Sequence, residues 1–150
     1  MRTTRRFGFP RALRGQKLLF GVLVLLSSVQ IGSAQTDFSA FWKRFKSAVI
    51  AGDKAAVVEM TKFPVSMSYG VKAVKNKENF LRRYDEIFKG EANAAQCFAK
   101  AEPRKESARR YEVYCPFKDT PNDWENAPIR FLFEFTKGGW KFSGLDNVNE

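Results

Sequence analysis

The sequence predicts an α+β domain in which N-terminal helices pack against a curved antiparallel sheet. Apolar side chains recur every three or four residues from Phe38 onward, which indicates amphipathic helices. They alternate with polar ones from Ile129 to Phe135, which indicates a strand. A glycine-bearing turn, Thr136 to Gly139, predicts that this strand continues into a hairpin.

The N-terminus has the three-part layout of a secretory signal peptide. A basic segment from Arg2 to Lys17 precedes nine apolar residues, Leu18 to Leu26, and a polar stretch that ends in Gly32-Ser33-Ala34. The apolar run is shorter than the roughly 20 residues that a spanning helix needs. We therefore expect cleavage after Ala34 and a periplasmic or secreted location in a bacterium, with no stable membrane anchor after cleavage; an uncleaved anchor is the alternative.

The charge of the chain is concentrated in this leader. The 150 residues contain 26 Lys and Arg, 16 Asp and Glu and no His, for a formal charge of +10. Six of the basic residues fall in residues 1–34, so the single mature domain, residues 35–150, keeps 20 basic and 16 acidic side chains and a charge of +4. This charge gives little support for nucleic-acid binding. The lack of His excludes His-dependent catalysis and His-containing metal sites.

Helices dominate the first half of the mature domain. The expected elements are, in order, a helix over Phe38 to Val49, a helix over Lys54 to Met60, a strand over Val65 to Tyr69 and a helix over Asn76 to Phe88. Asp37 and Asp53 fit as N-caps, and Gly52 fits the left-handed position at a helix end. Phe63-Pro64 ends the second helix because a residue before proline is held in an extended conformation.

Strands dominate the second half. The expected strands are Ala94 to Ala101, Arg110 to Phe117, Ile129 to Phe135 and Trp140 to Leu145, with a polar connection between the first two and a surface loop over 118–128. The order is α-α-β-α-β-β-β-β. Ile129, Phe131, Phe133 and Phe135 share one strand face, which the helices must cover. Arg130 and Glu134 lie on the opposite face.

Three segments resemble exported bacterial members of the nuclear transport factor 2-like superfamily. They are FWKRFKSAVIAGDKAAVVEMTKFPV (Phe41 to Val65), ENFLRRYDEIF (Glu78 to Phe88) and FLFEFTKGGWKFSGLDNV (Phe131 to Val148). The resemblance implies a cone-shaped, cystatin-like α+β roll, a pocket between sheet and helices, and a homodimer in many members. The superfamily includes ketosteroid isomerase, scytalone dehydratase and many non-catalytic binding domains, so the fold decides little about function. The His of scytalone dehydratase is missing here, and no motif matches the Tyr and Asp of ketosteroid isomerase.

Cys97 and Cys115 are the only cysteines. An exported protein meets an oxidising compartment, where such a pair forms a structural disulfide. In the two-strand interpretation a register centred on Glu106 places the two cysteines opposite one another. A redox-active pair is the alternative, but the spacing is not CxxC.

Acids and tyrosines are the remaining candidates for proton transfer. They are Asp85, Glu134, Asp146, Tyr69 and Tyr114. Strand alternation places Glu134 away from the phenylalanines, and Asp85 lies in a helical charge pattern typical of a surface. Because no matched acid and base pair emerges, we assign no catalytic residue. Because the chain has no His, its two cysteines are expected to pair, and its carboxylates lack the dense spacing of a calcium loop, we assign no metal and no cofactor.

Two basic clusters could meet anionic cell-wall polymers or lipid head groups. Their members are Lys72, Lys75, Lys77, Arg104, Lys105, Arg109 and Arg110. Interleaved acids, Glu78 and Glu106, favour the simpler interpretation that these are solvated surface residues.

The leading hypothesis is an exported non-enzymatic binding or accessory domain that uses an apolar pocket or an exposed sheet face. Its partner would be an apolar small molecule or an envelope protein. The side chains expected to line a pocket are Phe41, Phe45, Tyr69, Tyr84, Phe131, Phe133 and Trp140. The alternatives are a small cofactor-free isomerase or dehydratase that uses a buried carboxylate and a Tyr, and an envelope protein-protein contact module.

Export predicts a specific mature N-terminus. The protein recovered from the periplasm or medium should begin at Gln35, because Gly32 and Ala34 supply small residues before the cut. Intact-mass spectrometry checks this, and an exported chain that still carries residues 1–34 would contradict it.

Overall fold

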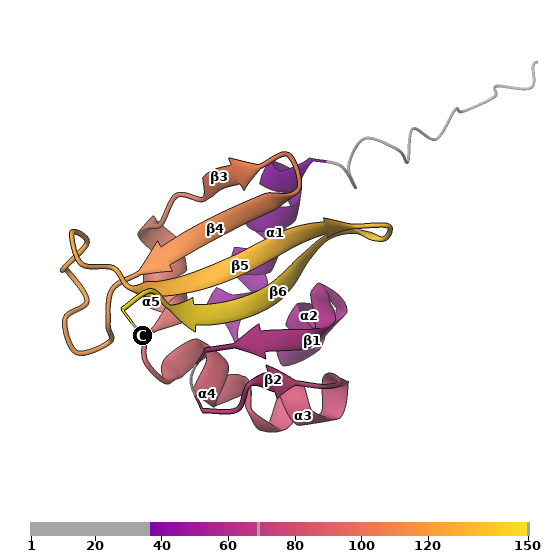
Figure 1. The fold of residues 1–150 in the computed structure, drawn as a ribbon, viewed down its shortest axis with the longest axis horizontal. Helices are drawn as coiled ribbons and strands as arrows, with labels where there is room; N and C mark the ends of the chain where they lie inside the picture. Colours follow the sequence, from indigo (N-terminus) through magenta and orange to yellow (C-terminus); the bar gives the residue numbers. More distant parts are fainter. Residues whose placement is uncertain (1–36, 69, 150) are drawn as a thin grey trace, which may run out of the picture.

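The computed structural model describes residues 37–68 and 70–149, which form helices packed on a six-stranded sheet (Figure 1). The helices are α1 (Phe38–Ala51), α2 (Lys54–Glu59), α3 (Lys77–Arg82), α4 (Tyr84–Lys89) and α5 (Ala94–Lys100). The strands are β1 (Thr61–Met67), β2 (Ala73–Val74), β3 (Arg104–Ser107), β4 (Arg110–Cys115), β5 (Ile129–Thr136) and β6 (Gly139–Asn147). The signal-peptide and Tyr69 predictions lie outside the described residues. Within the residues that the structure describes, no helix is long and apolar enough to cross a membrane.

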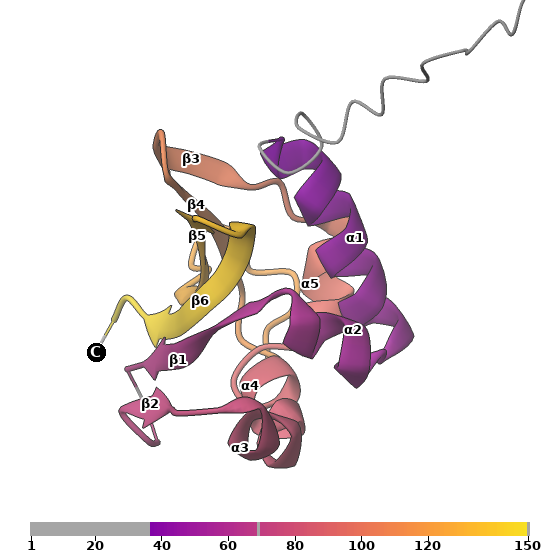
Figure 2. The same ribbon diagram turned by 90° about the vertical axis from the view of Figure 1, so that its right-hand side faces the viewer.

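The helices lie on one face of the curved, open sheet (Figure 2), so the predicted α+β class is confirmed. The strand order is β2-β1-β6-β5-β4-β3. The sheet differs from the predicted antiparallel sheet because it is mixed. The strand β1 runs parallel to β6, and all the other neighbouring strands of the sheet are antiparallel. A parallel pair needs a long crossover, here residues 68–138, and local hairpin patterns carry no signal for it.

The helix α1 begins and ends as its sequence predicts. The Asp37 carboxylate accepts a hydrogen bond from the Ser39 amide at 2.8 Å. Gly52 has φ 69°, a left-handed conformation that glycine adopts without steric cost, and its amide bonds the last turn. The capped helix presents one aromatic stripe to the sheet: Phe38, Phe41, Trp42 and Phe45.

The strand predicted over Ala94 to Ala101 is wrong, because this segment is the helix α5. The Asn93 side chain caps it by accepting from the Gln96 amide, and its buried residues Ala94, Cys97 and Phe98 follow a helical spacing. The true partner of β4 is β3, which occupies the segment expected to be a polar connection. All four β3 side chains are exposed, so no apolar alternation marked it as a strand.

Two smaller differences concern the region before α5. The helix expected over Asn76 to Phe88 is divided at Arg83 into α3 and α4. The two-residue strand β2, which the sequence did not predict, pairs with β1 at one edge of the sheet.

Cys97 and Cys115 form a disulfide with a Cα–Cα distance of 5.7 Å. The bond links α5 to the end of β4, so the expected cross-strand geometry is wrong although the pairing is the expected one. In the chain-entropy model, a link across 18 residues is worth roughly 3 kcal/mol. It anchors α5 over the inner face of the sheet.

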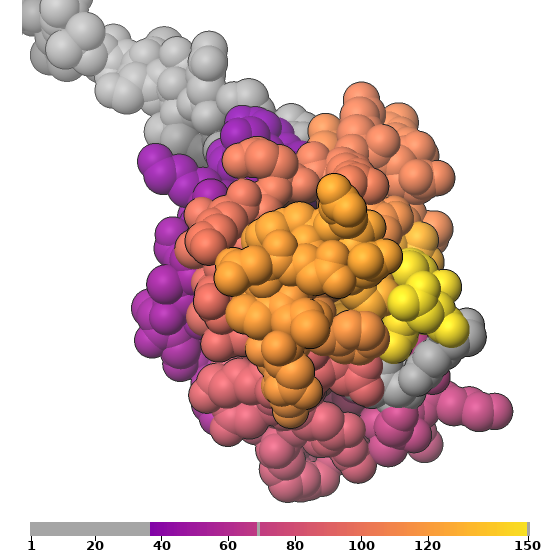
Figure 3. Space-filling view, turned by 90° about the vertical axis from the view of Figure 1, so that its left-hand side faces the viewer, coloured from indigo at the N-terminus to yellow at the C-terminus, as the bar shows by residue number. Residues whose placement is uncertain are grey.

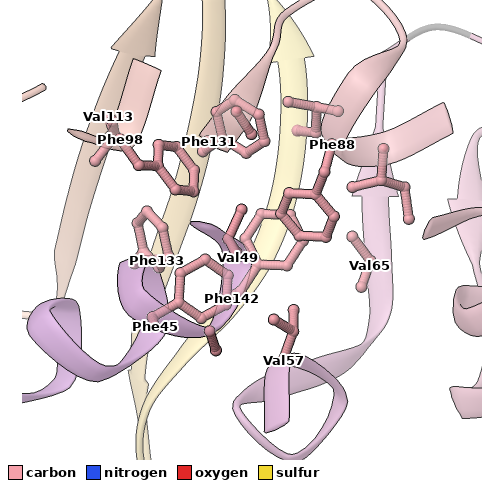
Figure 4. Packing of buried hydrophobic residues seen from close by; sticks show 14 of the residues in the cluster. Phe45, Val49, Val57, Val65, Phe88, Phe98, Val113, Phe131, Phe133 and Phe142 are labelled. Atoms are coloured by element: carbon pink, nitrogen blue, oxygen red, sulfur yellow. The ribbon is translucent and has the colours of Figure 1, made fainter. Parts of the chain in front are cut away.

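Phenylalanine rings fill the space between α1 and the sheet (Figure 4). The ring of Phe45 lies 5.2 Å from that of Phe133 and 5.6 Å from that of Phe142, measured between centroids. Phe98 from α5 packs edge-on against Phe131 at 4.9 Å. The inner face of β5 is therefore the predicted one: Ile129, Phe131 and Phe133 are fully buried, and Phe135 packs at the margin.

This face assignment predicts unequal effects of two neighbouring substitutions. Phe133→Ala should lower the free energy of unfolding by roughly 3–5 kcal/mol because it leaves a cavity in the core. Glu134→Ala, on the partly exposed outer face, should lower it by at most about 1 kcal/mol. Urea unfolding monitored by circular dichroism measures both, and equal small losses would show that β5 is assigned to the wrong face.

Candidate functional site

The side chains predicted to line an interior pocket are packed against one another. Phe45, Phe131 and Phe133 have no exposed surface, and Tyr84 is 1% exposed. Phe41 lies 5.7 Å from Phe45 between ring centroids. A ligand that bound among these residues would have to displace packed rings. An interior pocket lined by them remains a prediction.

Among the described members of the predicted set, Trp140 borders an open pocket of about 450 Å³ between the start of α1 and the sheet. Phe38, Trp42 and Tyr111 also line this pocket. Phe38 stacks on Tyr111 with 3.7 Å between ring centroids, and Trp140 packs edge-on against both rings. Because these rings cover one another, they offer a ligand little apolar surface.

Polar side chains gather instead on the outer face of the sheet. Arg130 on β5 donates two hydrogen bonds to Asp146 on β6, at 2.9 and 2.7 Å, and one to Glu112 on β4 at 3.4 Å. The Tyr114 hydroxyl donates to the second Glu112 oxygen at 2.8 Å. We call these four residues the outer-face network; they meet because β4, β5 and β6 are adjacent strands.

The network favours the protonated forms of Tyr114 and Arg130. Burial raises the pKa of the Tyr114 hydroxyl above its ordinary value, and the hydrogen bond to Glu112 raises it further. The hydrogen bonds with Asp146 raise the pKa of the Arg130 guanidinium. Tyr114 is therefore a protonated donor and Arg130 a fixed cation near neutral pH.

A pocket of about 250 Å³ opens beside this network. Its lining includes Tyr114, Arg104 from β3 and Trp124 from the loop before β5, and the loop meets the C-terminal residues there (Figure 3). The Arg104 guanidinium lies 4.8 Å from the centre of the Tyr114 ring. Trp124 is 39% exposed and Val148, also in the lining, is 47% exposed. We call this the Trp124 pocket.

Hydrogen bonds hold the loop that carries Trp124. The backbone and side-chain amides of Asn126 donate to the Asp123 carboxylate at 3.2 Å. The Lys118 amide donates to the Glu91 carbonyl at 2.7 Å and ties the loop to the segment before α5. Trp124 is thus an exposed aromatic side chain on an ordered support.

The other acidic candidates are paired surface groups. Lys62 and Arg110 contact the two oxygens of Glu134 at 2.7 and 3.4 Å, and the Lys62 hydrogen bond lowers the pKa of Glu134. Asp85 is exposed, and its hydrogen bond with Lys89 lowers its pKa. Within residues 37–68 and 70–149, no group of three or more acids and cysteines could hold a metal ion.

The structure brings two of the sequence candidates, Tyr114 and Asp146, into one network. Sequence reasoning missed Glu112, which is only 4% exposed although it lies on the outer face. Its strand parity with Tyr114 was visible in the sequence, but its pairing with Arg130 depends on the strand register. It also missed Trp124, which falls in a loop without periodicity.

No protein-family model and no curated protein matches the sequence. Among solved structures, an NTF2-like protein of unknown function from Pseudomonas putida KT2440 is 10% identical over 75% of this chain and 84% of its own, with a TM-score of 0.40. A ketosteroid isomerase-like protein from Erwinia carotovora atroseptica SCRI1043 is 16% identical over 77% and 95%, with a TM-score of 0.42. A hexachlorocyclohexane dehydrochlorinase from Novosphingobium barchaimii LL02 is 12% identical over 69% and 80%, with a TM-score of 0.38. At these TM-scores the likenesses assign neither a family nor a function.

The outer-face network predicts opposite shifts of one titration. Glu112→Gln should lower the pKa of Tyr114 because it removes a negative charge beside the forming phenolate, whereas Arg130→Gln should raise it by removing a positive one. The ultraviolet difference between each protein and its Tyr114→Phe counterpart isolates this tyrosine. A Tyr114 titration that ignores both substitutions would show that the network does not form.

Proposed function

We propose that this chain is a non-enzymatic binding domain whose contact surface is the outer sheet face at the Trp124 pocket. The observation that carries the proposal is the contrast between a ring-filled interior and an exposed Trp124 held on an ordered loop. Exposed aromatic residues in a concave surface with a few polar groups are typical of binding sites. The occupant would be a small molecule or partner segment with an apolar face.

The pairing of the acids supports binding over catalysis. Both Glu134 oxygens contact cations, and Asp146 forms two hydrogen bonds with Arg130. A general base needs an oxygen that can reach a substrate proton.

A small cofactor-free enzyme is the second candidate, and one observation favours it. The hydrogen bond between Tyr114 and the desolvated Glu112 provides a carboxylate and a Tyr beside an open pocket. In that case Tyr114 would exchange a proton with the substrate, and Glu112 would orient its hydroxyl. A contact module that binds an envelope protein would use the same exposed face.

We further propose that the domain is exported and belongs to the nuclear transport factor 2-like superfamily. The disulfide supports export because such bonds persist in oxidising compartments. The helices on one face of a curved sheet, together with the three resembling sequence segments, support the superfamily.

Thermal unfolding in the presence of aromatic and lipid-like compounds tests the proposed function. A compound that occupies the Trp124 pocket should raise Tm with concentration, by an amount equivalent to about 2.7 kcal/mol at a hundred times its Kd. Trp124→Ala should abolish the shift. Ile50→Ala is the matched control, since Ile50 is an exposed apolar residue on α1.

Three results would contradict the proposal. They are stabilisation that survives Trp124→Ala, the absence of any compound of any class whose binding depends on Trp124, and turnover of a compound that is lost in Tyr114→Phe. The last result would establish the enzyme in place of the binding domain.

A further inference from the structure

A second pocket, of about 590 Å³, lies at the other end of the outer face. Lys62, Arg109 and Arg110 line it together with Glu134 and Glu106. It is formed by the turn between β3 and β4, the end of β5, and Lys62 of β1. We call it the cationic pocket.

The cationic pocket holds one basic group that has no acidic partner in the described chain. Lys62 and Arg110 share the Glu134 carboxylate. Arg109 donates to the Phe135 carbonyl at 3.0 Å and forms no ion pair within residues 37–68 and 70–149. A guanidinium with free donors is suited to bind a carboxylate or another oxyanion.

The two pockets are separate, but each has a lining residue on the outer face of β4. Arg110 and Tyr114 are four residues apart on the same strand face, which corresponds to about 13 Å at the usual rise per residue. Glu112 lies between them, but it is almost fully buried and bonded to Tyr114 and Arg130. The hydrogen bonds from Tyr114 and Arg130 therefore offset the negative charge of Glu112 between the two pockets.

We propose that the outer face binds an acidic oligosaccharide, with one sugar ring on Trp124 and a carboxylate of a later unit in the cationic pocket. The apolar C–H face of a pyranose ring packs on an exposed indole, and Arg104 and Asn126 in the same lining can bond its hydroxyls. The Arg109 guanidinium can form an ion pair with a sugar carboxylate, which a neutral sugar lacks. This inference rests on the proposed function and names the ligand class for the same site.

Single-stranded nucleic acid also combines rings and negative charges, but it fits this surface less well. Its binding grooves stack successive bases on several aromatic residues and meet a phosphate at every unit. Here Glu125 lines the Trp124 pocket, and Glu106 lines the cationic pocket. These acids would face a phosphate chain and a uronate chain alike, so the preference for a sugar rests on the aromatic surface. Among the described residues Trp124 is the exposed large aromatic side chain, which can hold one pyranose ring but not a run of stacked bases.

Calorimetric titration with tetragalacturonate, with its neutral methyl ester as the matched ligand, tests the proposal. The acidic tetrasaccharide should bind more tightly, and added salt should weaken it. Trp124→Ala and Arg109→Gln should each reduce its affinity about tenfold or more, the effect of losing one strong contact. Lys89→Gln, which removes an exposed cation of α4, should leave it unchanged. Circular dichroism melting of each variant verifies that it is folded.

The possible failures are distinguishable. Equal affinity for both tetrasaccharides, or no effect of Arg109→Gln, would overturn the acidic ligand and leave the proposed function intact. Tighter binding of oligothymidylate would also overturn it. If neither saccharide binds while an aromatic compound still binds in a Trp124-dependent manner, the ligand class alone is wrong. If Trp124→Ala leaves the affinity for every tested ligand unchanged, both proposals fail.

Discussion

The packing of aromatic rings between α1 and the β5–β6 hairpin is the interaction on which the rest of the structure depends. Phe45 contacts Phe133, Phe142 and Phe98, so one helical residue joins two strands and a second helix. Each such ring removes a large apolar area from water, and the edge-on geometry adds to that gain. The disulfide then fixes α5 against β4 over the same core.

This packing determines where the molecule can act. In the part of the chain that the structure describes, packed rings fill the interior, and the polar network lies on the outer face of the sheet. On that face, β6 and β1 approach each other closely at Gly144 and Ser66. A Cβ on Gly144 of β6 would lie 2.2 Å from the Ser66 hydroxyl of β1, so only glycine fits there without displacing its neighbour. The network of Glu112, Tyr114, Arg130 and Asp146 lies on the neighbouring part of the same face.

Elements with a strong local period were predictable, and those fixed by distant partners were not. The stripe of α1 and the alternation of β5 carry their own signals. The segment AAQCFAK consists mainly of strong helix formers, so its helix was predictable from local propensity and the strand prediction was wrong. The exposed strand β3 has no apolar face, and the parallel pairing of β1 with β6 spans most of the domain.

The candidate site was predictable only in part, for the same reason. Tyr114 and Asp146 stood out as side chains able to exchange protons, but Glu112 gains its role from strand register, and Trp124 from the fold of its loop. The expected pocket residues were correctly identified as apolar and inward-facing for β5. Whether such rings enclose a cavity or fill the space depends on the combined volume of all the side chains in the core. This cannot be predicted from any one residue.

Nuclear magnetic resonance mapping of a bound saccharide tests the central claim, that the domain binds on its outer face and not in its interior. With tetragalacturonate added, the account predicts that the indole N–H of Trp124 and the amides of β4 and the 118–128 loop shift. The signal of the indole N–H of Trp42, a side chain of α1 that is buried against the sheet, should not shift. Shifts confined to Trp42 and to the core residues around Phe45 and Phe133 would contradict the account, because they would place the ligand between the helices and the sheet.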